Sequence, residues 1–398
     1  MTPNRQLAWL SVAMFLGMTL WFSATAATAP IVAEFRLTPG EAAWLTMAVQ
    51  GGFVLGTLVS AIVNLPDLLN PRLLFAAGCI AGAAANALLV RADGPVPLIA
   101  LRIATGVALA WVYPPGMKVA AGWFEKRRGA ALGILIGALT IGSAFPHLLA
   151  SASASVPWRA MILAASLLAL GGAAIIAALV GDGPYVTTSA RFDPRAVIAV
   201  FADRGTRLAT LGYLGHMWEL YAVWTWMAAF ATASLTSLTP SAVAPGSPTG
   251  SAVAFIMIAS GAMRSAAAGW WADTIGKARI ARQAMIVSGA CAAASGLVFG
   301  APPAVLALFA IVWGVSVVAD SAQLSALVAQ YSPRDHVGTA LTIQTCVGFL
   351  LTMVSIRLVP AFAQVVGWQW AFLLLLPGPA FGALTLAKLD DRQPPQAC

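Results

Sequence analysis

Apolar runs of roughly 20 residues recur along almost the whole chain and are separated by short polar segments. An α-helix needs a run of about this length to cross the hydrocarbon core of a bilayer. The composition agrees, because 60% of the residues are hydrophobic and 9% are charged, which would leave a water-soluble domain with a largely apolar surface. The sequence therefore predicts an all-α polytopic membrane protein.

We predict twelve transmembrane helices, joined by connections too short to hold a soluble catalytic domain. The expected spans are residues 7–30, 42–64, 72–91, 96–122, 129–153, 158–181, 206–234, 250–272, 279–299, 303–329, 337–363 and 369–388. Any chemistry must then take place inside the helical bundle.

The chain divides near its middle, where Gly181-Asp182-Gly183-Pro184 follows the sixth span. We predict an N-terminal six-helix bundle at residues 1–181, a cytoplasmic linker at residues 182–205 and a C-terminal six-helix bundle at residues 206–398. Inside the linker, residues 194–202 are expected to form either a short amphipathic helix on the membrane surface or a plain connection.

The two bundles are related by a sequence repeat. Gly129-Ala130-Ala131-Leu132 opens the fifth span as Gly338-Thr339-Ala340-Leu341 opens the eleventh, 209 positions later. Two parallel six-helix repeats with a binding site between them are the architecture of alternating-access transporters.

The positions of the basic residues predict the orientation, since Lys and Arg in short loops stay on the cytoplasmic side. Placing both termini in the cytoplasm leaves only Arg36, Arg91 and Arg159 on the outer side. The formal net charge of +8 therefore reads as a topology signal and an affinity for membrane lipid, because it is spread over many loops. No nucleic-acid partner is expected.

The sequence shows no pattern that is typical of an enzyme. There is no paired acid–base cluster, no metal-ligand spacing, no nucleophile motif and no Walker-type phosphate loop. Three of the four cysteines lie inside predicted spans, so we expect no disulfide, metal or cofactor.

One loop carries a resemblance to a known family. Residues 269–279, Gly-Trp-Trp-Ala-Asp-Thr-Ile-Gly-Lys-Ala-Arg, resemble the loop motif of the major facilitator superfamily, which occurs between spans two and three and again between spans eight and nine. The first place holds a decayed copy, with Asn64 where Asp273 stands in the second. The resemblance implies a conformational gate formed by Gly269, Asp273, Gly276, Lys277 and Arg279; the alternative is a solvated loop.

Two further stretches are similar to members of this family. Arg102, Gly106 and Ala110 resemble its fourth-span motif and share one helix stripe. The run from Gly212 to Leu220 resembles nitrate, nitrite and cyanate porters of prokaryotes, although the second span lacks the arginine that nitrate porters carry. The fifth-span antiporter motif is only partly present, since Ala138 replaces its proline.

Buried charges point to the mechanism, because a charge in the bilayer core costs at least about 2.5 to 3.5 kcal/mol without a partner or cavity. Glu219 and Asp320 are the only deep carboxylates among 14 acidic residues. The other deep ionisable residues are Arg102, Lys118, His147, His216, Arg264 and Arg357.

Arg264 lies nine residues before Asp273, roughly 13 Å from the cytoplasmic surface at 1.5 Å per residue, and its planar guanidinium suits an oxyanion. We therefore predict Arg264 as the substrate anchor, with Arg102, Trp226 and Gln323 as further binding residues. Glu219 and Asp320 are the expected proton sites and His216 a relay. The alternative is that Glu219 and Arg264 form a static pair.

These residues predict a secondary active transporter, proton-coupled and monomeric, for a small anionic or zwitterionic solute across the inner membrane of a bacterium. One alternative is proton-driven efflux of a hydrophobic or cationic compound, with Glu219 and Asp320 binding the cation. An alternative from another class is a membrane receptor that binds its ligand without transport.

Overall fold

The structure is a computed structural model that describes residues 2–125, 127–152, 156–185, 193–238 and 248–389, with only the backbone at residues 199, 264–274 and 334. Helices fill nearly all of these segments, as the run lengths of the sequence predict, and the prediction of an all-α fold is confirmed.

The helices up to α10 form the first half of the molecule. They are α1 (Pro3–Met18), α2 (Ser23–Ala26), α3 (Thr28–Phe35), α4 (Pro39–Val63), α5 (Leu65–Leu68), α6 (Pro71–Leu88), the 3₁₀ turn η1 (Leu89–Arg91), α7 (Pro95–Leu109), α8 (Tyr113–Trp123), α9 (Arg128–Ala152) and α10 (Trp158–Leu179).

The remaining helices form the second half. They are η2 (Pro194–Ala196), α11 (Val197–Ala202), α12 (Arg204–Leu238), α13 (Pro248–Ile275), α14 (Lys277–Ala294), η3 (Ser295–Leu297), α15 (Pro303–Ala319), α16 (Ser321–Tyr331), η4 (Arg334–His336), α17 (Val337–Val366), η5 (Trp368–Leu375) and α18 (Pro377–Leu386).

Each of the twelve predicted spans coincides with one of these helices or with a consecutive pair or group. Within the described segments, nine helical stretches are long and apolar enough to cross a membrane, and Pro248–Met263 is a shorter apolar helix. The short helix expected at residues 194–202 is present as η2 and α11, which pack against α12 and α17.

Three spans are interrupted in the middle rather than continuous. The first span breaks between α1 and α2, the fourth between α7 and α8, and the tenth at Asp320, between α15 and α16. Pro114 and Pro115 explain the fourth-span break, because proline has no N–H to donate to the preceding turn. Trp111 and Asp320 are 209 positions apart, so the breaks of the fourth and tenth spans follow the repeat.

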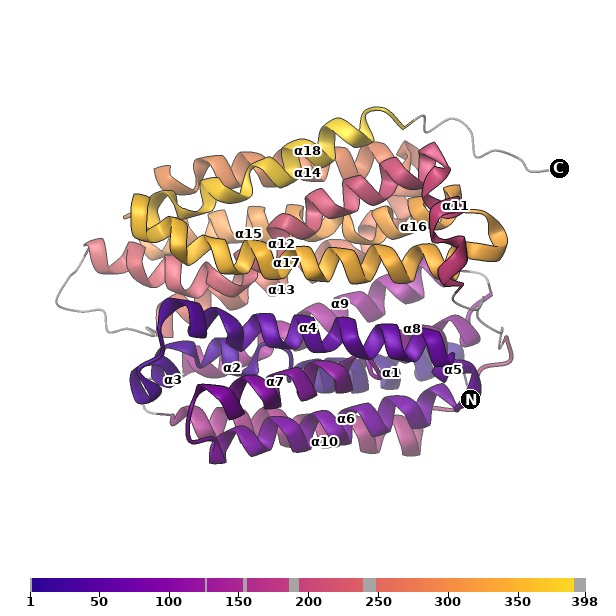
Figure 1. The fold of residues 1–398 in the computed structure, drawn as a ribbon, viewed down its shortest axis with the longest axis horizontal. Helices are drawn as coiled ribbons and strands as arrows, with labels where there is room; N and C mark the ends of the chain where they lie inside the picture. The colour runs from indigo at the N-terminus through magenta and orange to yellow at the C-terminus, as the bar shows by residue number, and fades with distance from the viewer. Residues whose placement is uncertain (1, 126, 153–155, 186–192, 239–247, 390–398) are drawn as a thin grey trace.

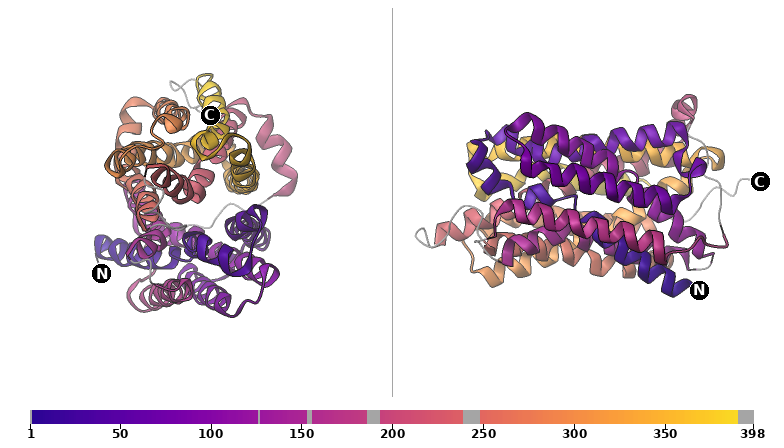
Figure 2. Two further views of the ribbon diagram at one scale, coloured as in Figure 1. Left: turned by 90° about the vertical axis from the view of Figure 1, so that its left-hand side faces the viewer. Right: turned by 90° about the horizontal axis from the view of Figure 1, so that it is seen from below.

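The two halves lie one above the other, with their helices running roughly along the same direction (Figure 1). Contacts between α9 and α13 and between α4 and α17 join them. The first helix begins and the last helix ends at the same end of the bundle, which we call the terminal end; the opposite end is the far end (Figures 1 and 2).

Glycine lets two helix pairs approach closely at equivalent positions of the halves. A Cβ at Gly106 of α7 would lie 2.2 Å from the Val49 carbonyl oxygen of α4. A Cβ at Gly314 of α15 would lie 1.9 Å from the Met257 carbonyl oxygen of α13. Gly106 and Gly314 are 208 positions apart, so the repeat preserves a backbone contact as well as a helix count.

Ion pairs tie helix ends together within the first half. At the terminal end, the Arg72 guanidinium donates two hydrogen bonds, of 2.7 and 2.8 Å, to Asp182, and this holds the pKa of Asp182 below its usual value. Lys118 pairs with Asp67 in the loop that the sequence analysis identified as the decayed motif copy. At the far end, Arg159 pairs with Glu34 at 2.5 Å.

Replacing Gly106 by alanine should destabilise the protein, because the added methyl group meets the backbone of α4, which cannot move aside as a side chain can. We expect a loss of about 1–3 kcal/mol, seen as a lower Tm in detergent. Gly129→Ala is the matched control, since a Cβ there meets nothing within 4 Å. Equal Tm values for the two variants would contradict the close contact.

Replacing Asp182 by asparagine should lower the Tm at pH 7. The difference in Tm from the wild type should become smaller as the pH falls. The lowered pKa of Asp182 means that the pair adds stability above the unfolded-state pKa of about 3.9, and that this stability is lost as the pH falls through the folded-state value. Because the pair is partly exposed, the effect should be at most about 1 kcal/mol. Asp93→Asn, at an exposed position, is the control and should keep the wild-type Tm at pH 7.

Candidate functional site

Glu219 is buried inside the second half, where two neighbouring helices donate hydrogen bonds to it. The Ser288 hydroxyl of α14 lies 2.6 Å from Oε1, and the Trp313 indole N–H of α15 lies 2.7 Å from the same oxygen. The residue is 2% exposed. A carboxyl group at this depth is held by three helices at once.

His216 lies one turn before Glu219 on α12 and contacts the break of the tenth span. Its Nδ1 is 2.9 Å from Oδ1 of Asp320, close enough for an ion pair although the approach is not aligned for a hydrogen bond. Its Nε2 is 2.8 Å from the Ser321 hydroxyl, the first residue of α16. Spacing of three residues puts His216 and Glu219 on the same face of α12.

The structure thus brings together all three residues that the sequence predicts for proton coupling. We call Glu219, His216 and Asp320 the titratable cluster. All the hydrogen-bonding and ion-pair partners described for them belong to the second half. Their role in coupling stays a prediction, but their assembly into one buried group is a property of the fold.

Arg102 occupies a different kind of site from the one expected for a substrate ligand. Its Nε donates to the Leu45 carbonyl oxygen at 3.0 Å, and its other two nitrogens donate to the carbonyl oxygens of Leu20 and Trp21. The Nη1 atom of Arg102 also donates to the Ser23 hydroxyl and to the side-chain oxygen of Asn86. Every guanidinium nitrogen is engaged and the side chain is fully buried, so Arg102 holds the break of the first span; its role in substrate binding stays a prediction.

Of the other predicted substrate-binding residues, the structure describes the side chains of Trp226 and Gln323. The Trp226 indole N–H donates to the Ile356 carbonyl oxygen at 2.9 Å, so the one polar group of this side chain is bonded within the second half. Gln323 is buried in α16, three residues after Asp320. The side chain of Arg264 lies outside the described residues, although the backbone of α13 is helical through it.

The predicted gate motif is only partly described. The side chain of Asp273 and the surroundings of Gly269 lie outside the described residues. Gly276 has φ +101° and forms the whole turn between α13 and α14, a conformation that favours glycine. The Lys277 ammonium donates to the Gln330 side chain at 3.0 Å, which links α14 to α16, and Arg279 is exposed.

A group of aromatic side chains, which sequence reasoning did not single out, packs between the two halves. We call Trp21, Phe22, Phe53, Tyr221, Trp224 and Phe349 the aromatic layer. Across the interface, the Trp21 ring centroid lies 5.7 Å from that of Tyr221, and Phe53 lies 4.8 Å from Phe349. The sequence signal that could have revealed this layer is the concentration of aromatic residues in the first span of each half.

Tyr213 connects the titratable cluster to this layer. Its ring centroid lies 6.0 Å from the His216 ring. The same Tyr213 ring packs against Gly348 of α17, where its Cε1 would lie 2.4 Å from a Cβ. Gly348 precedes Phe349, so the cluster and the layer are joined through side chains of α12 and α17.

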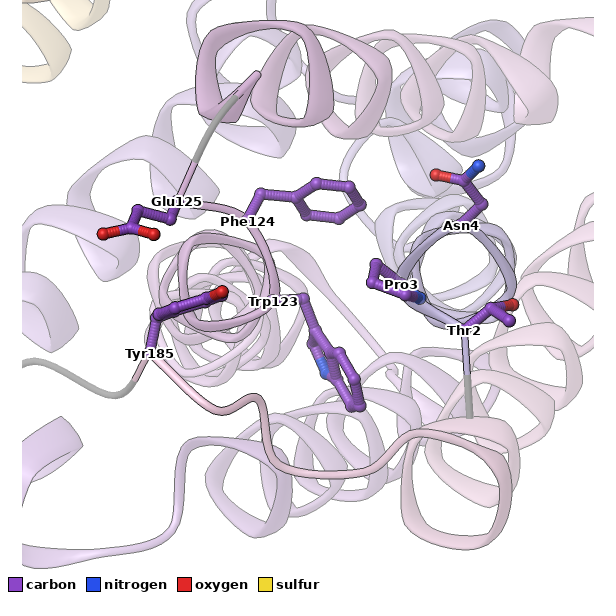
Figure 3. A pocket seen from close by; sticks show the side chains of 7 residues that line it. All are labelled: Thr2, Pro3, Asn4, Trp123, Phe124, Glu125 and Tyr185. Atoms are coloured by element: carbon purple, nitrogen blue, oxygen red, sulfur yellow. The ribbon is translucent and has the colours of Figure 1, made fainter.

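A separate hollow of about 570 Å³ opens at the terminal end of the first half (Figure 3). Residues 2–4 at the start of the chain face residues 123–125 at the end of α8 and Tyr185 across it. It contains none of the predicted site residues, and Glu125 is its one charged residue.

The many long apolar helices of the described segments define a class, that of multi-pass membrane proteins. The sequence profile of the Major Facilitator Superfamily matches residues 10–319 and 249–397. The chain therefore belongs to the Major Facilitator Superfamily. It is a membrane transporter and not an enzyme, and its partner is a small-molecule substrate. No curated protein matches the sequence significantly.

Solved structures of transporters share the fold. A variant of the nucleoside transporter NupG superposes with a TM-score of 0.74 at 14% identity, covering 96% of this chain and 99% of that one. A bacterial homologue of the human lysosomal transporter Spinster, inward-facing and unoccupied, gives 0.71 at 13% identity, with 97% of each chain covered. The human organic anion transporter MFSD10 gives 0.67 at 13% identity, covering 96% and 99%.

Replacing Arg102 by methionine should prevent stable folding rather than weaken substrate binding. The change removes the Arg102 donor from the carbonyl oxygens of Leu20, Trp21 and Leu45 in a low-dielectric interior, where each group left unsatisfied costs about 1–3 kcal/mol. The measurement is the monodisperse yield and Tm after size-exclusion chromatography. Arg91→Met, at an exposed position, is the control; equal behaviour of the two would contradict the structural role.

Proposed function

We propose that the protein is a proton-coupled transporter, with Glu219, His216 and Asp320 as the proton site. The observation that carries this proposal is that two carboxyl groups and one imidazole, each 2–3% exposed, lie together inside the second half. A buried charge is costly unless it is paired. One imidazolium balances only one of the two carboxylates, so the cluster offers a place for a proton.

The position of Asp320 gives a route from protonation to movement. Asp320 forms the break between α15 and α16, and breaks of this kind absorb backbone rotation during conformational change. A change in the charge of Asp320 alters its attraction to His216, and Tyr213 links His216 to α17 at the interface of the halves. Protonation can therefore bias the angle between the halves.

Orientation and assembly form part of the same proposal. The basic residues Arg72, Arg128, Lys277 and Arg279 lie in the first turns of α6, α9 and α14, helices that begin at the terminal end. By the positive-inside rule this end faces the cytoplasm of a bacterial inner membrane, so both termini are cytoplasmic. We infer that one chain is the transporting unit.

Fold alone does not give the substrate, because the similar structures are named for a nucleoside and for organic anions. The anionic or zwitterionic solute expected from the sequence requires Arg264, since Arg102 is engaged by carbonyl oxygens. Efflux of a cation would use Glu219 and Asp320 as ligands. A receptor would bind its ligand without flux.

Glu219→Gln tests the proton site directly. The carboxamide keeps the size of the side chain and can still accept from Ser288 and Trp313, but it cannot release a proton. Proteoliposomes loaded with a pH-sensitive dye should show solute-induced proton movement for the wild type, tested with small carboxylates, inorganic oxyanions, uncharged ring solutes and lipophilic cations. The variant should lose this movement at least tenfold.

The exposed Glu125→Gln is the matched control and should behave as wild type. Solute exchange across the membrane should persist in Glu219→Gln, because binding and alternation do not require the proton. Undiminished proton movement in that variant and in Asp320→Asn would show that the cluster is only a structural element.

A further inference from the structure

Several polar groups in and beside the aromatic layer are buried without a protein partner. They are the indole N–H groups of Trp21 and Trp224, both imidazole nitrogens of His147 and both ends of the Gln50 carboxamide. The four side chains are between 0 and 3% exposed. Burying such groups without a hydrogen bond is costly, so each of them needs a partner that the protein does not supply.

The ring contacts place these groups around one region. The Phe22 ring lies 6.2 Å from the His147 ring and 6.1 Å from the Trp224 ring. Trp21, the neighbour of Phe22 in the chain, lies 5.1 Å from Phe53. Phe22 of the first span therefore lies against rings of both the fifth and the seventh spans, across the interface of the halves.

Gln50 belongs to the same region through its place on α4. It lies one turn from Phe53 and one turn from Thr46, whose hydroxyl is 2.7 Å from that of Thr25 in α2. Side chains at this spacing share a helix face. The carboxamide therefore faces the broken first span, on the side where Trp21 and Phe53 meet.

The chemistry of these groups defines what they can bind. An indole N–H only donates, a carboxamide donates and accepts, and neutral imidazole does one of each. None is a fixed charge, and aromatic faces surround them and favour a planar ring. We propose that this region binds an uncharged solute that carries a planar ring and several hydrogen-bonding groups, with Gln50, Trp21, Trp224 and His147 as its ligands.

This inference rests on the proposed transport function and adds its substrate class. Arg102 donates to the backbone of Trp21 and so acts as a positioning residue. The titratable cluster is held by partners in the second half. The four proposed ligands thus offer hydrogen bonds without a net charge, in contrast to the anion site expected from the sequence.

The test uses solutes of nearly the same ring and size that differ in charge. Nicotinamide is uncharged, nicotinate is an anion and 1-methylnicotinamide, methylated on the ring nitrogen, is a cation; uracil and orotate form a second uncharged and anionic pair. Purified full-length protein is heated with each, because a ligand of the native state raises the Tm. We expect an uncharged member to give the largest increase.

Two substitutions make the test specific to these residues. Gln50→Leu removes an unpaired carboxamide, so it should raise the Tm of the ligand-free protein while lowering the affinity for the uncharged solute at least tenfold. Trp224→Phe keeps a ring but removes the N–H, and should lower the affinity with little change in Tm. Gln369→Leu is the control, since Gln369 donates to Gly296 and lies away from the layer.

The opposite results would overturn the inference. These are stabilisation by only a charged member, no stabilisation by any ring solute, or a Gln50→Leu protein that is less stable and binds as before. Binding of an uncharged solute without proton movement would refute the coupling proposal and leave this site standing. Proton movement driven only by an anion would refute this site and leave the coupling proposal standing.

Discussion

The structure depends on how the backbone of the broken first span is satisfied inside the membrane. A bilayer offers no water to free carbonyl groups, so a helix break must find donors within the protein. Arg102 supplies them from the fourth span to Leu20 and Trp21, and reaches Leu45 of the second span as well. One guanidinium thereby fixes three spans together and sets where Trp21 and Phe22 enter the interface.

The number and order of the spans could be predicted from the sequence, because run length and polar punctuation depend on the bilayer alone. The same holds for the titratable cluster, since deep charges are rare and Glu219, His216 and Asp320 stood out by their depth. The role of Arg102 could not be predicted, because two of its partners, the carbonyl groups of Leu20 and Trp21, lie at a break that the run length of the first span does not reveal. The aromatic layer and the pairing of Lys118 with Asp67 depend on tertiary packing, which a linear pattern does not contain.

The proposed proton site and the proposed solute site are separate in space and linked in structure. The first is enclosed by α12, α14, α15 and α16, whereas the second lies where the halves meet. Tyr213 contacts His216 on one side and α17 on the other. A transporter built this way need not bring the proton and the solute into contact; each can favour the same arrangement of helices.

The glycine contacts of Gly106 and Gly314 decide which parts of the bundle can slide. Where backbone meets backbone, two helices interlock without flexible side chains between them, and relative motion would drive carbonyl oxygens into main-chain atoms. We therefore expect α4 and α7 to move together as one unit, and α13 and α15 as another. We expect motion between the halves to take place at the interfaces of α4 with α17 and of α9 with α13, where side chains can repack.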